Sequence, residues 1–565
     1  MASPTFLLGC ALLFLVSSCA SAAIVEETFH VANLTIERLC IQKTIVAING
    51  SYPGPVLRVR EGDSVILHVV NDSPYDLTIH WHGLIQFRNS WADGPDYVTQ
   101  CPIKPGNTYI YRFNVTSQEG TLWWHAHISY LRATVHGAII IRPRKGRTYP
   151  FPKPDKEVPI IFGEWWYSNV EDIVNEGQAY GVPPNLSDAF TINGQPGDLY
   201  NCSANSMYKL QVKQGKTYLL RLVNAVMQSI LFFKMANHSF TVVAVDASYV
   251  NPYTTDIITI TPGQTMDVLL KADQPIGSYY MRTKVYQGSD LIAFSRQNST
   301  AVIEYIGSKS TTPIMPILPD HSANDTAHRF FTNLTGLTTA PFWHPVPQQV
   351  DERLLITLGL GLLPCEGQGN TSCLGPNGQR IAASMNNRSF EPSKELSILE
   401  AYYYNVSDIY TTDFPIEPPV KFDYSNESNT FNFALLPTVR SHGVRQIKYN
   451  STVEIIFQNT AFGSVENHPM HLHGHDFHVI ALGYGNYNPA TARFNLVNPQ
   501  LQNTVAVPIG GWTVIRFRAN NPGVWFIHCH LEVHVPWGLA TAFIVENGPT
   551  PETSLIAPPQ DLPKC

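Results

Sequence analysis

Histidines gather in four short windows of the sequence, which together hold 11 of its 20 histidines. The windows are His80-Trp-His82-Gly83, His125-Ala126-His127, His468-Pro-Met-His471-Leu-His473-Gly-His475 and His528-Cys529-His530-Leu-Glu-Val-His534. Imidazole is the commonest ligand that proteins offer to metals. So dense a concentration predicts metal centres rather than isolated hydrogen-bonding histidines.

The spacing within the windows indicates how the ligands are presented. Alternate residues of a β-strand point to the same face of a sheet, so His125 and His127 should share one face, as should His528 and His530. Cys529 then points to the opposite face. One strand thereby offers two imidazoles to one centre and a thiolate to another, and only a few covalent bonds separate the two centres for an electron to cross.

The ligand types favour copper. Thiolate and imidazole suit soft metals, and a set of two histidines and one cysteine is typical of blue-copper electron-transfer sites. Zinc binds the same ligand types and is the alternative metal. The paired windows contain more histidines than one zinc site can use, so the sequence favours copper.

The elements that position these ligands are predicted to be strands. A chain of 565 residues is too long for one core, and its 37 glycines and 42 prolines lie between short alternating apolar runs. One segment recurs at 62–71, 215–224 and 450–459, and another matches between 120–127 and 523–530, where Ala126 replaces Cys529. Such repeats predict an all-β chain of three β-sandwich domains, with boundaries at 23–144, 154–325 and 326–565. The middle domain lacks a histidine window and is expected to serve as a scaffold and as a wall of the substrate cleft.

The N-terminus and the glycosylation motifs predict a secreted protein. Residues 1–22 combine an apolar run with small residues, as in a signal peptide; a membrane anchor is the alternative, because no Lys or Arg precedes the run. The sequence has many Asn-x-Ser/Thr motifs, among them those at Asn33, Asn114, Asn185, Asn298, Asn333, Asn405 and Asn450. A charged fraction of 14%, a net charge of -7 and the lack of a basic run argue against nucleic acid and membranes as partners.

Cysteine usage agrees with an oxidising compartment. Beyond the signal peptide the cysteines are Cys40, Cys101, Cys202, Cys365, Cys373, Cys529 and Cys565. If Cys529 binds metal, an even number remains for three disulfides, whose pairing the count does not determine. Local spacing suggests only the pair Cys365 and Cys373.

All four windows resemble the copper-binding motifs of the multicopper oxidases, and specifically of laccases, across nearly the whole mature chain. The resemblance implies three cupredoxin-like Greek-key domains and four copper ions. It implies type 1 ligands His468, Cys529 and His534, type 2 ligands His80 and His471, and type 3 ligands His82, His125, His127, His473, His528 and His530. His475 matches no ligand position, and we expect it to be structural.

The resemblance also assigns roles outside the ligand set. Leu539, ten residues after Cys529, takes the position on the type 1 axis, where leucine cannot ligate and should raise the reduction potential. Asp93 and Glu532 match acids that supply protons for dioxygen reduction; without the resemblance, a purely turn-forming role for Asp93 in Asp-Gly-Pro competes. Finally, the resemblance implies the disulfides Cys101 to Cys565 and Cys40 to Cys202.

The function implied is that of a laccase in the cell wall, acting as a monomer that carries N-linked glycans. It would oxidise phenols such as lignin precursors one electron at a time and reduce dioxygen to water. The alternatives are an ascorbate oxidase, which Leu539 disfavours, a ferroxidase, which needs acids around the type 1 histidines, and a copper-binding wall protein without activity.

Overall fold

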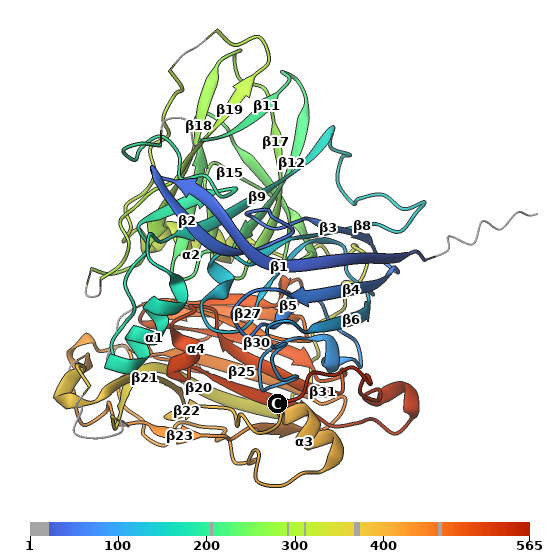
Figure 1. The fold of residues 1–565 in the computed structure, drawn as a ribbon, viewed down its shortest axis with the longest axis vertical. Coiled ribbons are helices and arrows are strands. Elements are labelled where there is room, and N and C mark those ends of the chain that lie inside the picture. Colours follow the sequence, from blue (N-terminus) through green and yellow to red (C-terminus); the bar gives the residue numbers. More distant parts are fainter. Residues whose placement is uncertain are drawn as a thin grey trace, which may run out of the picture.

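The computed structural model describes residues 22–203, 207–290, 293–309, 312–365, 373–430, 432–460 and 466–565. Strands dominate, and they form three units of two sheets each that follow one another along the chain (Figure 1). This arrangement confirms the all-β prediction. The predicted signal peptide at 1–22 lies almost entirely outside the described residues, and the predicted domain boundaries stay a prediction.

The first unit consists of two four-stranded sheets. One has the order β2 (Ile41–Ile48), β1 (Ile24–Arg38), β4 (Ser64–Asn71), β6 (Thr108–Asn114), and the other β3 (Leu57–Arg60), β8 (His136–Arg142), β7 (Gly120–Ala126), β5 (Ile79–His82). Burial alternates along β4, as expected for a strand with one face on a core. All of β7 is buried because it lies between the first unit's core and the other two units.

The second unit pairs a six-stranded sheet with a five-stranded sheet. The orders are β10 (Ala189–Ile192), β9 (Lys156–Trp165), β12 (Thr217–Asn224), β17 (Thr265–Lys271), β14 (Phe240–Val245), β15 (Ser248–Thr255), and β11 (Tyr208–Val212), β19 (Thr300–Tyr305), β18 (Ser278–Tyr286), β13 (Ile230–Met235), β16 (Ile258–Ile260). Helices α1 (Val170–Tyr180) and α2 (Asn324–Asn333) lie at its borders. Asn169 caps α1 by accepting the backbone N–H of Glu171, and Gly181 ends it in the left-handed conformation.

The third unit has an eight-stranded and a five-stranded sheet. The orders are β23 (Val439–Ser441), β22 (Arg388–Phe390), β21 (Arg380–Met385), β20 (Glu352–Leu363), β25 (Thr452–Asn459), β30 (Gly511–Arg518), β27 (Phe477–Tyr484), β28 (Leu501–Gln502), and β24 (Arg445–Ile447), β32 (Ala540–Val545), β31 (Gly523–Cys529), β26 (His468–Leu472), β29 (Thr504–Val507). Helices α3 (Ile398–Tyr404) and α4 (His534–Trp537) complete it. No helix among the described stretches is long and apolar enough to cross a bilayer.

The sequence repeat is a structural repeat. Its three copies are the strands β4, β12 and β25, and each pairs parallel with the strand before it in its sheet order and antiparallel with the strand after it. The second repeat forms β7 and β31, each the inner strand of an antiparallel trio. The first and third units therefore present equivalent strands, and they share one continuous core that runs from Phe29 to Phe526 and Leu562.

One disulfide ties the C-terminal residue to the first unit, and another closes a loop of the third unit. Cys101 is bonded to Cys565, and Cys365 to Cys373, as predicted. The predicted third disulfide is wrong for this structure, because Cys40 and Cys202 are both free thiols. The Cys40 thiol lies 3.4 Å from the carbonyl oxygen of Cys202, without a bond between the two sulfurs.

Candidate metal centres

Strand pairing brings the histidine windows together in pairs. In the first unit β5 lies against β7 with His80 opposite His125, and in the third unit β26 lies against β31 with His471 opposite His528. Because the residues two positions along each strand share a face, each pair of strands presents a patch of imidazoles. The two patches face each other across the boundary between the first and third units, where the His80 and His473 rings stack at 4.0 Å and those of His82 and His471 at 3.7 Å.

Eight buried histidines thereby form one cluster. Their ring nitrogens fall into overlapping groups whose ligand atoms all lie within 4.8 Å of one another: His80 with His471 and His473, His80 with His82 and His125, and His127 with His473 and His528. His530 joins the second group, since its Nε2 lies 3.2 Å from Nδ1 of His82. The eight members are those that the resemblance assigns to the type 2 and type 3 coppers.

Hydrogen bonds at the back of four of the rings fix which nitrogen faces the centre. The Nδ1–H groups donate to backbone carbonyls: His80 to Asp93 at 2.7 Å, His125 to Ala126 at 2.8 Å, His471 to Asn503 at 2.8 Å and His528 to Cys529 at 2.9 Å. Their Nε2 lone pairs are thus left for a metal. Among the described residues, Nε2 of His80, His125 and His471 are buried without a protein partner, which is what ligand atoms of a metal cluster should show.

Burial disfavours the charged form of most of these histidines. It lowers the pKa of His528 to about 3 and the pKa values of His471 and His473 well below the usual range, with neighbouring histidines adding to the effect on the latter two. Neutral imidazole is the form that binds metals. The fold therefore presents His471, His473 and His528 in the form that metals require at any ordinary pH.

The second unit closes the cluster, although it supplies none of the eight histidines. Gly263 lies against the rings, and a side chain added there would come within 2.9 Å of His530 and 3.2 Å of His82. Its carbonyl oxygen accepts the indole N–H of Trp123 at 2.9 Å. Only glycine, which also tolerates the positive φ of 92° found here, lets the second unit approach so closely.

A second donor set lies on the other face of β31. Cys529 Sγ is 3.7 Å from Nδ1 of His468 and 3.4 Å from Nδ1 of His534, and all three residues are buried. Burial lowers the pKa of His468 to about 3. Burial also acts to lower the pKa of His534, but Glu466, 3.0 Å from its Nε2, and Cys529 outweigh it and raise that pKa to about 10.

The two donor sets are joined by the strand itself, as the spacing predicts. Cys529 stands between His528 and His530, and the carbonyl of Cys529 accepts the His528 ring N–H. A thiolate with two imidazoles suits a blue-copper site, and the eight-histidine cluster suits further coppers. The donors present therefore fit four copper ions.

The two predicted acids lie at opposite edges of the eight-histidine cluster. Asp93 is fully buried and accepts the His473 Nδ1–H at 2.8 Å, while its other oxygen lies 3.4 Å from Nδ1 of His80. Glu532 is held by a short ion pair with Arg132. Burial raises the pKa of Glu532 against the opposing effect of Arg132.

The remaining predicted positions are also buried. Leu539 lies in the same core as Cys529, and its backbone bonds to both Cys529 and His534 at 3.0 and 2.9 Å. His475 belongs to none of the donor groups found among the described residues; its Nδ1 contacts the carbonyl of His473 at 3.3 Å.

Sequence reasoning missed three residues around the donor sets. Arg132 places its guanidinium 3.2 Å from Nδ1 of His530. Glu466 contacts His534, and the hydroxyl of Thr504 lies 3.0 Å from both His82 Nε2 and His471 Nδ1. None of the three belongs to a repeated pattern. Only the position of Glu466, two residues before His468, could have drawn attention to it.

Comparisons with known proteins agree with this geometry. Three family models described as multicopper oxidase match residues 30–146, 156–308 and 413–549. Laccase-7 of Arabidopsis thaliana is 54% identical over 99% of both chains, and Laccase-24 of Oryza sativa subsp. japonica is 52% identical over 98% of both. The crystal structure of the laccase from Botrytis aclada, at 26% identity, superimposes with a TM-score of 0.73 over 95% of this chain and 89% of that one. The chain therefore belongs to the multicopper oxidases and, within them, to the plant laccases, which are oxidoreductases with four copper ions.

Proposed function

We propose that this laccase oxidises phenols at the Cys529 site and reduces dioxygen to water at the eight-histidine cluster. His468, Cys529 and His534 would hold the type 1 copper; His80 and His471 the type 2 copper; and His82, His125, His127, His473, His528 and His530 the type 3 pair. The observation that carries the proposal is the position of Cys529, which joins both donor sets through one strand.

Copper, when bound, supplies the one-electron redox chemistry, and the chain supplies position, insulation and protons. An electron from the phenol enters at the His468 and His534 edge. It then crosses from Cys529 to His528, either along the backbone or through the hydrogen bond of the His528 ring to the Cys529 carbonyl. Four such transfers match one dioxygen. Burial of every donor excludes bulk water from both sites.

Asp93 and Glu532 act on different histidines of the cluster. Asp93 orients His473 through a direct hydrogen bond and holds His80 through its backbone carbonyl. Glu532 lies at the opposite edge, where Arg132 holds it beside His530. Carboxyl groups in such positions can hold and pass the protons that dioxygen reduction consumes.

Competing activities find less support. Ascorbate oxidation is disfavoured by Leu539, and the relatives matched over nearly their full length are laccases. Ferroxidase activity needs several acids around the type 1 histidines. In the described part of the chain, Glu466 is the carboxylate paired with His534. A copper-binding wall protein without activity does not need a complete second set of ligands, which this chain has.

The test is oxygen uptake by the copper-loaded protein with a monolignol-like phenol, ascorbate and ferrous iron in parallel. Phenol should drive uptake without release of peroxide, because a complete cluster takes dioxygen to water. Dominant turnover of ascorbate or iron would move the enzyme to a sister activity. A lack of uptake with every donor would overturn the catalytic proposal.

We also infer that the protein is secreted, glycosylated and monomeric. Among the Asn-x-Ser/Thr asparagines named above, Asn33, Asn114, Asn185, Asn333, Asn405 and Asn450 are exposed, and Asn298 is half-buried. Protein purified from the medium of a plant host should therefore lose mass on enzymatic removal of N-glycans. An unchanged mass would contradict glycosylation, and sedimentation of the same sample tests the monomer.

Replacing Leu539 with methionine should lower the type 1 reduction potential. A thioether on the axis stabilises the oxidised copper, so phenol oxidation should slow severalfold while the blue absorbance persists. Redox titration of that absorbance measures the effect. Leu531→Met is the matched control, since Leu531 is buried in the same core and such swaps cost little stability. An unchanged potential in Leu539→Met would show that Leu539 lies off the axis.

A further inference from the structure

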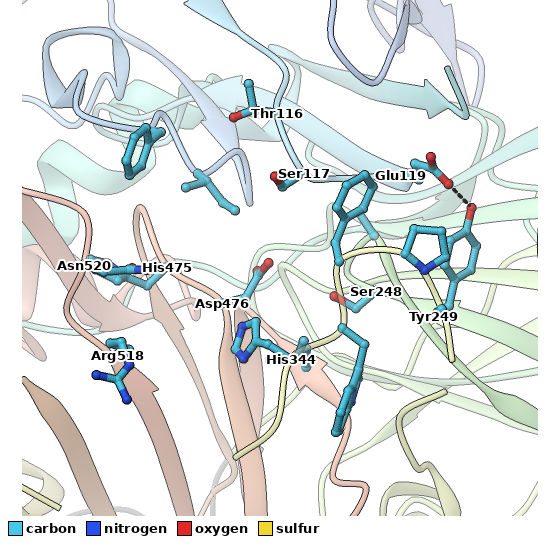
Figure 2. Close-up of a pocket in the computed structure, with 18 of the residues that line it drawn as sticks. Thr116, Ser117, Glu119, Ser248, Tyr249, His344, His475, Asp476, Arg518 and Asn520 are labelled. Carbon is cyan, nitrogen blue, oxygen red and sulfur yellow. Dashed lines mark hydrogen bonds between the residues drawn. The ribbon is translucent and has the colours of Figure 1, made fainter. Parts of the chain in front are cut away.

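A pocket of about 630 Å³ lies where the three units meet. Its wall includes Ser117 and Glu119 of the first unit, Tyr249 of the second, and His344 and Asp476 of the third (Figure 2). None of the assigned ligands lines this pocket. In Figure 2 the carboxylate of Asp476 points into the pocket above His344.

Asp476 is the inward end of this pocket. It follows His473 by three residues, and its Oδ1 is buried without a protein partner among the described residues. The Asn503 side chain lies close enough to act on the Asp476 carboxyl, and Nε2 of His475, the preceding residue, is buried without a protein partner among the described residues. Buried polar groups of this kind are generally satisfied by ordered water, so this wall is suited to hold a short chain of water molecules.

A second acid, Asp246, lies behind the wall. It is buried and accepts backbone N–H groups from Thr265 at 2.9 Å, Asn503 at 3.2 Å and Thr504 at 3.1 Å. Burial raises the pKa of Asp246 to about 7. Burial likewise raises the pKa of Asp476 to about 7, and repulsion from Asp246 adds to the effect while Asn503 opposes it.

The residues that Asp246 holds lead directly to the cluster. The carbonyl of Asn503 accepts the Nδ1–H of His471 at 2.8 Å. The hydroxyl of Thr504 contacts both His471 and His82 at 3.0 Å. One dipeptide therefore separates the two acids from the histidines that we assign to the type 2 and type 3 coppers.

We propose that Asp476 and Asp246 form a proton-delivery route from this pocket to the His82 and His471 edge of the cluster. The inference rests on the proposed function. Reducing one dioxygen to two waters consumes four protons along with the four electrons taken from phenol. In each step the Asp476 carboxylic acid releases its proton inward through ordered water, and the resulting carboxylate takes a proton from solvent in the pocket.

The geometry gives this route a role that Glu532 does not have. Glu532 lies beside His530 and is bound to Arg132, whereas Asp476 has no cation partner among the described residues. The groups that face Asp476 and bear on its titration are Glu119, His344, His475, Arg518 and Asp246. An acid that is half ionised near neutral pH both releases and regains a proton readily.

The experiment separates proton delivery from phenol oxidation. Copper-loaded wild type, Asp476→Asn and Asp246→Asn are reduced with dithionite, and their reoxidation by dioxygen is followed by stopped flow between pH 6 and 8. Glu119→Gln is the matched control, because Glu119 lines the same pocket but bonds to Tyr249 at 2.8 Å. Reduction of the type 1 site by phenol under anaerobic conditions is measured beside it.

Dioxygen should reoxidise both reduced aspartate variants at least about tenfold more slowly than wild type. Loss of an acid that acts directly slows a reaction by ~100-fold or more. The effect is smaller here because water replaces part of the relay. Anaerobic reduction of the variants by phenol and their copper content should match wild type. Unchanged reoxidation in Asp476→Asn, or an equal slowing in Glu119→Gln, would overturn the route. If phenol failed to reduce the wild-type protein, the proposed function would be contradicted. The route would still be tested, because dithionite reduces the protein without phenol.

Infrared spectra of the copper-free protein supply a readout that is independent of turnover. Protonated carboxyl absorbance should decrease as pH rises through about 7, the value to which burial raises the pKa of Asp476, and Asp476→Asn should lack the share of it that Asp476 contributes. A band that is the same in the variant and in wild type would show that Asp476 is already ionised, and it would overturn the route.

Discussion

Replacing Cys529 with alanine should abolish phenol-driven oxygen uptake and the blue absorbance together. The thiolate is the soft ligand between His468 and His534, and a methyl group can neither bind copper nor pass an electron to His528. Phenol oxidation should fall by several orders of magnitude, to the rate of the copper-free protein. Absorbance spectra and oxygen uptake of the purified variant measure both effects.

The same variant should leave the eight-histidine cluster intact. The histidines neighbouring Cys529 point to the opposite face of β31, so copper analysis should find the variant short of one ion and still able to hold the others. Cys40→Ala is the matched control, since it also removes a free thiol, but an exposed one far from β31 in sequence. A blue absorbance that survives in Cys529→Ala would contradict the type 1 assignment.

The donor sets were predictable because strand alternation is a local rule. The spacing of His125 and His127, and of His528 and His530, already states which side chains share a face, and the structure places them so. The recurring ten-residue segment likewise predicted three equivalent units, which β4, β12 and β25 confirm. Strand periodicity and sequence repeats predict which side chains share a face, because each strand must bury one face whichever strands it pairs with.

What the sequence could not give depends on packing between units. Arg132 meets His530 across a sequence separation of 398 residues, and Asp246 meets Thr504 across 258. No periodic pattern links such residues, since their encounter is decided by how whole sheets dock. Cys40 and Cys202 show the same limit: the chain brings them close, but the side-chain orientation in this structure leaves both thiols free.

Replacing Asp93 with alanine should slow dioxygen reduction by about 100-fold while leaving phenol oxidation at the type 1 site intact. The carboxylate orients His473 at 2.8 Å and lies 3.4 Å from His80, so its loss frees one type 3 ligand and removes an acid beside the cluster. Stopped-flow reoxidation of the reduced enzyme measures the first effect, and anaerobic bleaching of the blue absorbance by phenol measures the second.

Asp93→Asn separates the two roles of the carboxylate. Asparagine keeps the Asp-Gly turn, where the backbone packs so tightly that a side chain at Gly94 would collide with the carbonyl of Ile79, and its amide oxygen can still accept from His473. It cannot carry a proton. If proton supply dominates, the asparagine variant should be as slow as alanine but retain the full copper content and type 2 spectrum. If ligand orientation dominates, it should recover most of the rate. Equal bleaching and reoxidation rates in wild type and Asp93→Ala would exclude both roles and leave Asp93 as a turn residue.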